Sequence, residues 1–455
     1  MVTTIQRKAT DIFGWPIISL LFKNPIALFV VRTVTMLLFV SALYFGFSHP
    51  LSSENPYTTA IFWSLFWPFF MIVSLILMGP AFCGICPHGV LGRWLTPKGA
   101  NKTMPDWLKN RNIGLAILLI AYWVPLYLFP GLLKTPWVAS LLFLLLTIFA
   151  AFIFLRYKEM SYCTYLCPIG AVTKAYGKVG MTKLETYQSA CSECKTFECA
   201  TTCQSGLQPY LFEKKNSMRD CTLCMDCAVA CEAVSFSITK PGSALSGEIK
   251  DRHTSHTWVY ILLFAVITIT MRLHHGLGHS PMKESLPWYQ AGNWIETLLP
   301  IGIDWVGFVA LLTALALTFA LVFGGFNIAS KVVNIPFKEF LHRNSYALAP
   351  VMIIGSLSHI GTFFFVHYAS NLGNAWFWII GSAETMSPLA TMRDGWVHIF
   401  SLFGFVGGIW SLGLLYHRIA DYQVSLSQKL RAWLAGSLVI WGYIFLLILQ
   451  MTARG

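Results

Sequence analysis

The twelve cysteines are the residues of this sequence whose type and spacing point most directly to chemistry. Eight of them form two motifs, CSECKTFECATTC, with Cys191, Cys194, Cys199 and Cys203, and CTLCMDCAVAC, with Cys221, Cys224, Cys227 and Cys231. The second motif has the C-x2-C-x2-C-x3-C spacing of bacterial ferredoxins, in which the fourth thiolate ligates the other cluster. The pattern predicts two [4Fe–4S] clusters, held by Cys191, Cys194, Cys199 and Cys231 and by Cys221, Cys224, Cys227 and Cys203.

Other uses of these eight thiols are less favoured. Disulfides are rare in a reducing cytoplasm, and structural zinc usually takes two separated ligand pairs rather than four cysteines within eleven residues. The first motif departs from the ferredoxin pattern, because four residues separate Cys194 from Cys199 and no proline follows Cys203 or Cys231. We therefore expect the first cluster to differ in geometry or exposure, and hence in potential.

The remaining four cysteines lie in two CP motifs, MGPAFCGICPHGV and SYCTYLCPIGAV, each after an apolar run; they are Cys83, Cys86, Cys163 and Cys167. The proline after each second cysteine ends one helix or starts the next. Gly89 and Gly170 permit close approach of the backbone. Three interpretations stay open: an additional iron–sulfur cluster or metal ion held by all four thiols, a redox-active dithiol, and a structural loop that binds nothing.

The elements that position these motifs are expected to be membrane helices. Of 455 residues, 56% are hydrophobic and 11% charged, against about 25% charged in soluble domains. Nine apolar windows are long enough to cross a bilayer core of about 30 Å: 27–47, 60–80, 112–130, 138–156, 257–275, 303–325, 346–370, 395–417 and 431–451. The sequence thus predicts an all-α polytopic membrane protein of about nine transmembrane helices, with a small α+β ferredoxin-like insert holding two clusters.

The predicted organisation has three parts. Residues 1–156 contain four helices and the first CP motif, residues 157–256 contain the second CP motif and the ferredoxin-like insert, and residues 257–455 contain five helices. The loop 87–111 carries five Lys and Arg residues and the loop 48–59 carries none, so the positive-inside rule predicts a cytoplasmic amino terminus and insert. The net charge of +12 fits basic loops beside anionic lipid. Nucleic acid is not expected as a partner, because no basic patch with interleaved aromatic residues occurs.

The combination of motifs resembles the NapH/NosR-type membrane polyferredoxins. The resemblance covers roughly residues 60–240 and rests on FCGICPHG and YCTYLCPIGA followed by the two ferredoxin motifs. It implies a multi-pass protein of a bacterial inner membrane that passes electrons between a cytoplasmic or quinone donor and a periplasmic acceptor, either a reductase partner or a metal ion.

Two other function classes stay open beside membrane electron transfer. One is an assembly or metallation accessory factor whose cysteines carry or reduce a metal for a metalloenzyme. The other is a redox subunit of an iron or copper uptake permease. In each case the chain would be a redox-active electron carrier or oxidoreductase subunit, and the sequence identifies no catalytic residue.

Histidines in the second half are candidates for a further site. MRLHHGLGHSPM places His274, His275 and His279 near the predicted outer face, where they suit a metal ion. His359 and His367 lie eight residues apart in one window, and His398 is expected at the depth of His367. Neutral imidazole binds haem iron and other metals, so haem b or an iron or copper site is predicted here. The alternative is hydrogen bonding between helices.

Overall fold

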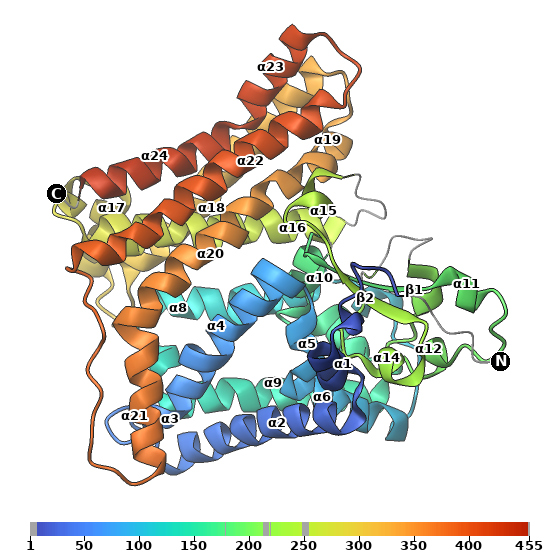
Figure 1. Cartoon of the computed structure of the whole chain (residues 1–455). Coiled ribbons are helices and arrows are strands. Elements are labelled where there is room, and N and C mark those ends of the chain that lie inside the picture. Colours follow the sequence, from blue (N-terminus) through green and yellow to red (C-terminus); the bar gives the residue numbers. More distant parts are fainter. Residues whose placement is uncertain (1–6, 178, 213–217, 219, 248–253, 454–455) are drawn as a thin grey trace. The chain divides into compact units, whose positions relative to one another are not determined.

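The computed structural model describes residues 7–177, 179–212, 218, 220–247 and 254–453, which form two compact units (Figure 1). Unit 1 comprises the described parts of Met1–Ile117, Thr135–Asp251 and Asn371–Thr385. Unit 2 comprises those of Leu118–Lys134, Arg252–Ser370 and Met386–Gly455. All twelve cysteines belong to unit 1, whereas the six candidate histidines belong to unit 2.

The described residues contain seven helices that are long and apolar enough to cross a membrane. They are Pro25–Ser48, Pro56–Met78, Pro136–Arg156, Thr254–His279, Trp305–Val332, Phe337–Ile379 and Gly395–Ala420. An eighth arises if α23 (Leu426–Gly436) and α24 (Leu438–Thr452), which meet at 51°, form one span. The remaining predicted window, 112–130, falls on a shorter apolar helix, Asn112–Leu128. The chain is therefore a mostly helical membrane protein with seven to eight candidate spans, and the count of nine stays a prediction.

Unit 1 is built around two long helices that lie side by side, α2 (Pro25–Ser48) and α9 (Pro136–Arg156) (Figure 1). Asn24 caps α2 by accepting hydrogen bonds from the amides of Ile26 and Ala27, and Pro25 occupies the first helical position, as helix starts favour. The second span of this unit consists of α3 (Pro56–Thr59), η2 (Ala60–Phe66), α4 (Trp67–Phe70) and η3 (Met71–Met78). Its shorter helices are α1 (Pro16–Lys23), α5 (Ala81–Ile85), α6 (Pro87–Leu95), α10 (Gly170–Gly177), α11 (Gln188–Cys191), α12 (Glu198–Thr201), α14 (Asp226–Ala230) and α15 (Ser243–Ser246).

Unit 2 is all helical in its described residues. Its main elements are α8 (Val124–Leu128), α16 (Thr254–Leu263), η10 (Phe264–Ile269), η11 (Arg272–Gly276), α17 (Pro287–Leu298), α18 (Trp305–Val332), α19 (Phe337–Asn344), α20 (Ala349–Phe363), η15 (Phe364–Tyr368), η16 (Gly395–Ser401), α22 (Leu402–Ala420), α23 and α24. Helix α22 packs against both α20 and α24, so polar side chains on these three helices meet inside the unit. The helix α21 (Ala369–Ile379) falls almost entirely within unit 1.

A two-stranded sheet encloses the ferredoxin motifs. Strand β1 (Thr182–Thr186) pairs antiparallel with β2 (Val234–Ile238), and Leu184 lies opposite Phe236 in the buried core. Because β1 precedes Cys191 and β2 follows Cys231, the pairing closes both ends of the eight-cysteine segment. The sheet agrees with the predicted α+β insert, whose cytoplasmic location stays a prediction.

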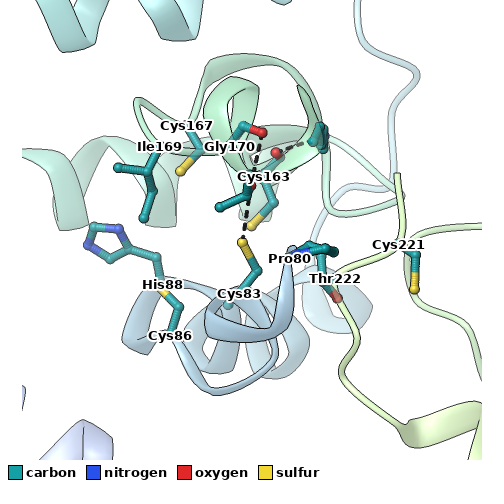
Figure 2. Close-up of a pocket in the computed structure, with 13 residues that line it drawn as sticks. Pro80, Cys83, Cys86, His88, Cys163, Cys167, Ile169, Gly170, Cys221 and Thr222 are labelled. Atoms are coloured by element: carbon teal, nitrogen blue, oxygen red, sulfur yellow. Dashed lines mark hydrogen bonds between the residues drawn. The ribbon is translucent and has the colours of Figure 1, made fainter. Parts of the chain in front are cut away.

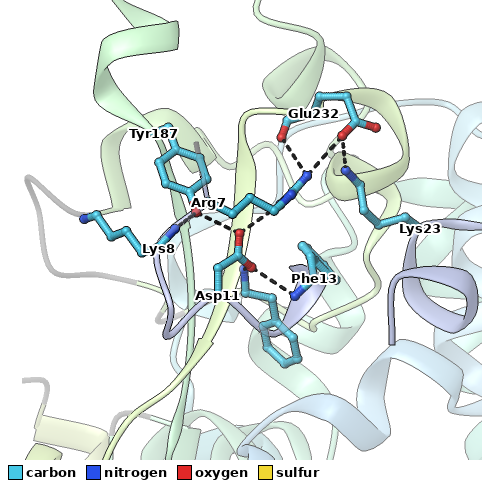
Figure 3. A network of polar contacts seen from close by, with 8 residues as sticks. Arg7, Lys8, Asp11, Phe13, Lys23, Tyr187 and Glu232 are labelled. Atoms are coloured by element: carbon cyan, nitrogen blue, oxygen red, sulfur yellow. Dashed lines mark hydrogen bonds and ion pairs between the residues drawn. The ribbon is translucent and has the colours of Figure 1, made fainter. Parts of the chain in front are cut away.

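A buried carboxylate fastens the amino-terminal segment to this sheet (Figure 3). Asp11 accepts hydrogen bonds from the backbone amides of Phe13 and Phe236, both at 3.1 Å, and from the Arg7 guanidinium and the Tyr187 hydroxyl, both at 2.8 Å. These four donors compensate a carboxylate that is only 3% exposed. The amino-terminal segment therefore fixes the edge of β2 directly after the last ferredoxin cysteine.

Asp11→Ala should loosen the insert, because it leaves buried donors without an acceptor and Arg7 without its buried partner. We expect a loss of about 3 kcal/mol in unfolding free energy and faster hydrogen exchange at the amides of β2, measured by mass spectrometry. The matched control is Asp106→Ala, since Asp106 forms an exposed pair with Lys109 of the kind that contributes little. Equal exchange rates in the two variants would contradict the role assigned to Asp11.

Candidate functional site

The four CP cysteines converge on one pocket in unit 1 (Figure 2). Cys83 and Cys86 approach from α5 and the start of α6, and Cys163 and Cys167 approach from η8 (Tyr162–Leu166) and the residue after it. The Cys83 thiol donates a hydrogen bond of 3.5 Å to the Thr173 hydroxyl on α10. The structure thus brings together all four residues that the sequence predicts for this site.

A π-helical turn makes the two CP motifs equivalent despite their different lengths. In the first motif the Cys86 amide donates to the Phe82 carbonyl oxygen, four residues earlier, at 2.8 Å. In the second, the Cys167 amide donates to the Tyr162 carbonyl oxygen, five residues earlier, at the same distance. The wider turn absorbs one extra residue, as single π turns at functional sites do. The C-x2-C and C-x3-C spacings therefore both end with the amide of the second cysteine bonded to the carbonyl oxygen of the residue before the first cysteine.

Two glycines allow each CP loop to fold back on itself. A Cβ atom built at Gly89 would lie 2.6 Å from the Cys83 carbonyl oxygen, and one built at Gly170 would lie 2.7 Å from the Cys163 carbonyl oxygen. No real side chain fits at such distances, so each loop needs glycine two residues after its proline. The residues between proline and glycine both line the pocket and differ in polarity: they are His88 and Ile169.

Two basic residues accompany the thiols, each seven positions after the second cysteine of its motif. Lys174 is 4% exposed, and its ammonium donates to the carbonyl oxygens of Cys163 at 3.0 Å and Thr164 at 2.8 Å. Arg93 donates to the Gly84 carbonyl oxygen at 2.8 Å. Neither residue is predicted from the sequence as part of a site, although both occupy the same position of a repeated pattern, C-P-x-G-x3-Arg/Lys.

Ion pairs extend from Lys174 to the second ferredoxin motif. The Lys174 ammonium lies 3.4 Å from Asp220, whose other oxygen accepts from Arg111 at 2.9 Å. Burial lowers the pKa of Lys174, and Asp220 opposes that shift. Since Asp220 directly precedes Cys221, the pairs connect the second CP motif to the start of the ferredoxin motif.

The surrounding protein favours the protonated form of the CP thiols when no cation is bound. Burial raises the pKa of all four, that of Cys86 to about 11, while Arg93 lowers the pKa of three of them. Amides of His88 and Gly89 also donate to the Cys86 sulfur and lower its pKa. Burial lowers the pKa of His88 to about 4, so its imidazole is neutral where it bonds the Thr147 hydroxyl at 2.8 Å. Thiolate formation at this pocket therefore requires a bound cation, as metal ligation does.

The second predicted ligand set also lies around one pocket, which is lined by Cys203, Cys221, Cys224 and Cys227. Leu223 and Met225 adopt left-handed backbone conformations, with φ of 49° and 64°, which wrap the loop around the thiols. The Leu223 amide donates to the Cys221 sulfur at 3.4 Å. Burial raises the pKa of Cys224 to about 11. Backbone donors directed at cysteine sulfur are a feature that tunes iron–sulfur centres.

The first predicted set is brought together in part. The thiols of Cys199 and Cys231 share a hydrogen bond, which raises the pKa of Cys199 and lowers that of Cys231 to about 6. This contact joins the two motifs in the crossed manner that the ferredoxin spacing predicts. Cys191 and Cys194 lie on one turn, where the Cys194 amide donates to the Cys191 carbonyl oxygen at 3.2 Å and the Phe197 amide donates to the Cys194 sulfur at 3.4 Å.

The CP pocket and the second ferredoxin pocket are neighbours. Cys221 and Thr222 line both, and a Cβ atom at Gly84, between Cys83 and Cys86, would lie 2.6 Å from the Leu223 carbonyl oxygen. Arg32 on α2 holds the same loop by donating to the Cys224 carbonyl oxygen at 2.5 Å and to Asp226 at 2.7 Å. Backbone-to-backbone contact at Gly84 thus places the two groups of thiols side by side.

The donor set fits iron–sulfur clusters. Among the residues that the structure describes, no group of three or more His, Cys, Asp or Glu side chains has a geometry that holds one metal ion. A single tetrahedral ion draws sulfur ligands to about 2.3 Å, whereas a four-iron cluster spreads its cysteines around a larger body. Thiols gathered around a pocket, with amide donors and buried cations, suit the larger group.

The candidate histidines lie in unit 2 and form two separate groups. The rings of His274 and His275 are 4.6 Å apart, those of His275 and His279 stack at 6.1 Å, and His274 bonds Asp304 at 3.0 Å. His359 and His367 flank Phe363, and His359 bonds the Tyr368 hydroxyl at 3.3 Å. His398 lies on another element, η16. The metal and haem hypotheses for these residues stay predictions.

Comparisons with known proteins find one iron–sulfur family model and two relatives. Residues 59–104 and 137–186 both match a family model described as a 4Fe-4S binding domain, and each stretch contains one CP motif. "Putative electron transport protein YccM" of Escherichia coli (strain K12) is 27% identical over 261 residues, which cover 48% of this chain and 67% of the relative. An uncharacterized protein of Methanocaldococcus jannaschii is 26% identical over 176 residues, which cover 36% of this chain and 68% of the relative. No solved structure matches the chain.

Gly170→Ala should open the second CP loop, since the new methyl group would collide with the Cys163 carbonyl oxygen. Overpacking of this kind destabilises by about 1–3 kcal/mol, so we expect a lower melting temperature in detergent and faster alkylation of the CP thiols in metal-free protein. Gly324→Ala is the matched control, because a Cβ atom there meets nothing within 4 Å. The packing argument fails if Gly170→Ala behaves like Gly324→Ala.

Proposed function

We propose that this chain, as a protein of the 4Fe–4S membrane electron-transfer family that the comparisons support, carries electrons across a bacterial inner membrane. The donor would be a cytoplasmic protein or a quinone, and the acceptor a periplasmic reductase partner or metal ion. In this proposal the amino terminus and the ferredoxin-like insert are cytoplasmic, and residues 1–156, 157–256 and 257–455 are its membrane, cluster-binding and membrane parts.

One observation carries the proposal: three groups of cysteines lie in unit 1, and two of them share the wall formed by Cys221 and Thr222. A protein that stored or delivered one metal would not need a second thiol group in backbone contact with the first. Adjacent one-electron centres are, in contrast, what electron transfer through a protein requires. In this proposal electrons pass between the Cys221 group and the CP thiols across that shared wall.

The residues proposed to hold the clusters are the two crossed ferredoxin sets and the CP set. The first comprises Cys191, Cys194, Cys199 and Cys231, the second Cys203, Cys221, Cys224 and Cys227, and the third Cys83, Cys86, Cys163 and Cys167. When bound, an iron–sulfur cluster supplies a one-electron redox centre whose potential depends on charge, hydrogen bonds and exposure. A cluster at the CP cysteines goes beyond the two ferredoxin clusters, and the match of both CP stretches to a 4Fe-4S binding domain supports it.

The chain's own side chains set the electrostatic conditions of the CP pocket. Lys174 and Arg93 place positive charge beside the thiols and so favour their ionised form and added negative charge. Neutral His88 and Ile169 line the same pocket without adding charge. The expected consequence is a higher reduction potential at the CP pocket than the same thiols would have without the two cations.

A metallation or assembly factor is the second candidate, and the CP pocket argues against it. The CP thiols are partly exposed, but they lie beside a second group of thiols with which they share the wall formed by Cys221 and Thr222, an arrangement that delivery of a metal does not require. A permease role would rest on the histidines of unit 2, whereas the matched 4Fe-4S family model covers the two CP stretches of unit 1. Electron transfer is thus the better-supported function.

Cys163→Ser tests the third centre by composition. The purified wild-type protein should contain about 12 irons and 12 acid-labile sulfides, as three [4Fe–4S] clusters require, and Cys163→Ser should lose about four of each. Cys227→Ser is the matched variant, because it should remove a different paramagnetic resonance signal and leave the CP signal in place. If the wild-type protein contains only about eight irons and Cys163→Ser does not change that number, the CP cysteines hold no cluster and only the two ferredoxin clusters are supported.

Sealed proteoliposomes test transfer across the membrane. With the insert facing outward, a membrane-impermeant reductant outside should reduce a membrane-impermeant acceptor trapped inside, and Cys227→Ser should abolish the reaction. Asp106→Ala is the control, since its exposed ion pair is remote from all cysteine motifs in the sequence. Failure of the wild-type protein, with its clusters shown to be present and reducible, would rule out transmembrane electron transfer.

A further inference from the structure

A basic loop of unit 1 lies against the carboxyl-terminal end of the membrane helix α9. The Ala100 amide donates to the Leu155 carbonyl oxygen at 2.7 Å. Two residues later, the Lys102 amide donates to the Arg156 carbonyl oxygen at 3.2 Å, and the Lys102 carbonyl oxygen accepts from the Lys158 amide at 3.1 Å. These backbone hydrogen bonds bring Lys102 next to Arg156, although the two residues are far apart in the sequence.

The surface formed by this loop and the end of α9 carries positive charge that no carboxylate balances. Asp106 pairs with Lys109 at 2.7 Å, and Glu159 pairs with Lys158 at 2.9 Å. They are the carboxylates of residues 87–111 and 155–160. Three exposed cations of these segments form no ion pair with the residues that the structure describes: Lys98, Lys102 and Arg156.

Two exposed tryptophans accompany these cations. Trp94 is 63% exposed and Trp107 is 75% exposed. Their neighbours Leu95 and Leu108 pack against the core that also holds the end of α9, so both indoles border that end. The Lys98 ammonium lies 3.9 Å from the centre of the Trp94 ring, within the range of a cation–π interaction. Exposed tryptophans at the end of a membrane helix are typical of the level of the lipid head groups.

An apolar stripe on α9 leads to the cations. Its members are exposed and recur at spacings of three and four residues, which places them on one face of the helix: Leu145, Ile148, Phe149, Phe152 and Leu155. Arg156 follows Phe152 by four residues and continues this face. Because α9 is long and apolar enough to cross a membrane, the stripe suits lipid acyl chains, and the cations lie where the head groups begin.

We propose that Lys98, Lys102 and Arg156 bind the head group of an anionic phospholipid. Their N–H groups donate to the phosphate oxygens, the acyl chains lie along the stripe of α9, and Trp94 and Trp107 flank the head group. A lipid matches this surface better than an acidic protein does, because the positive charge continues directly into an apolar face. The site shares no residue with the CP pocket, so it is independent of the proposed electron transfer.

Native mass spectrometry of the purified full chain tests this site by counting bound lipid as phosphatidylglycerol or phosphatidylcholine is added in detergent. We expect the wild-type protein to bind phosphatidylglycerol saturably and more tightly than phosphatidylcholine. Lys98→Gln, Lys102→Gln and Arg156→Gln should each weaken phosphatidylglycerol binding about fivefold, the effect of one cation near an anionic lipid, without changing phosphatidylcholine binding. Arg156→Lys keeps the charge and should keep the preference for phosphatidylglycerol.

The matched control is Lys183→Gln, which removes an exposed lysine of β1 and should bind phosphatidylglycerol as the wild type does. The proposal is overturned if the wild type binds both lipids equally, which would favour an acidic protein as the partner, or if the three variants behave like Lys183→Gln. Displacement of the lipid by glycerol phosphate at equal concentration would also overturn it, because a soluble phosphate would then suffice. Iron and sulfide contents at the wild-type value would show that weaker lipid binding reflects lost charge rather than lost fold.

Discussion

Charge compensation inside unit 1 is the constraint on which its cysteine sites depend. Four thiols around one pocket become thiolates more readily where positive charge lies close by, and Lys174 and Arg93 contribute such charge, beside that of a bound cation, from equivalent positions of the two CP motifs. The same two side chains also donate to carbonyl oxygens of the CP loops. They therefore both offset the charge of the thiolates and hold the backbone that carries the cysteines. Asp220 then ties Lys174 to Arg111 and to the backbone that leads into Cys221. A change in any of these ions would alter both the charge and the shape of the pocket.

The backbone, more than the side chains, defines where the thiols lie. Phe197, Leu223 and Met225 hold left-handed conformations within the ferredoxin motifs, which non-glycine residues adopt only where the surroundings enforce them. The paired strands and the Asp11 network provide that enforcement at the end of the segment. At the CP loops the same purpose is met by glycines that bring one stretch of backbone against another.

Much of this arrangement could be anticipated from the sequence, because iron–sulfur loops are local. The crossed contact of Cys199 with Cys231 follows from spacing alone, and all nine apolar windows coincide with apolar helices. The comparisons confirm the resemblance to 4Fe–4S membrane electron carriers.

The number of spans could not be fixed, because hydropathy does not reveal the bend at Ser437 or decide whether Asn112–Leu128 crosses a bilayer. The cations were missed for a similar reason: a lysine in a basic loop reads as a surface residue until tertiary structure shows it buried. The backbone contact at Gly84 joins segments about 140 residues apart and has no local signature.

The π turn before Cys167 has a consequence for the polarity of the CP pocket. If the extra residue is set aside, the two halves correspond position by position, with Phe82 matching Tyr162, Gly89 matching Gly170 and Arg93 matching Lys174. His88 and Ile169 are then the pair at which the copies diverge in polarity. One half of the pocket offers an imidazole and the other a branched hydrocarbon, so two otherwise corresponding motifs give the site a polar side and an apolar side.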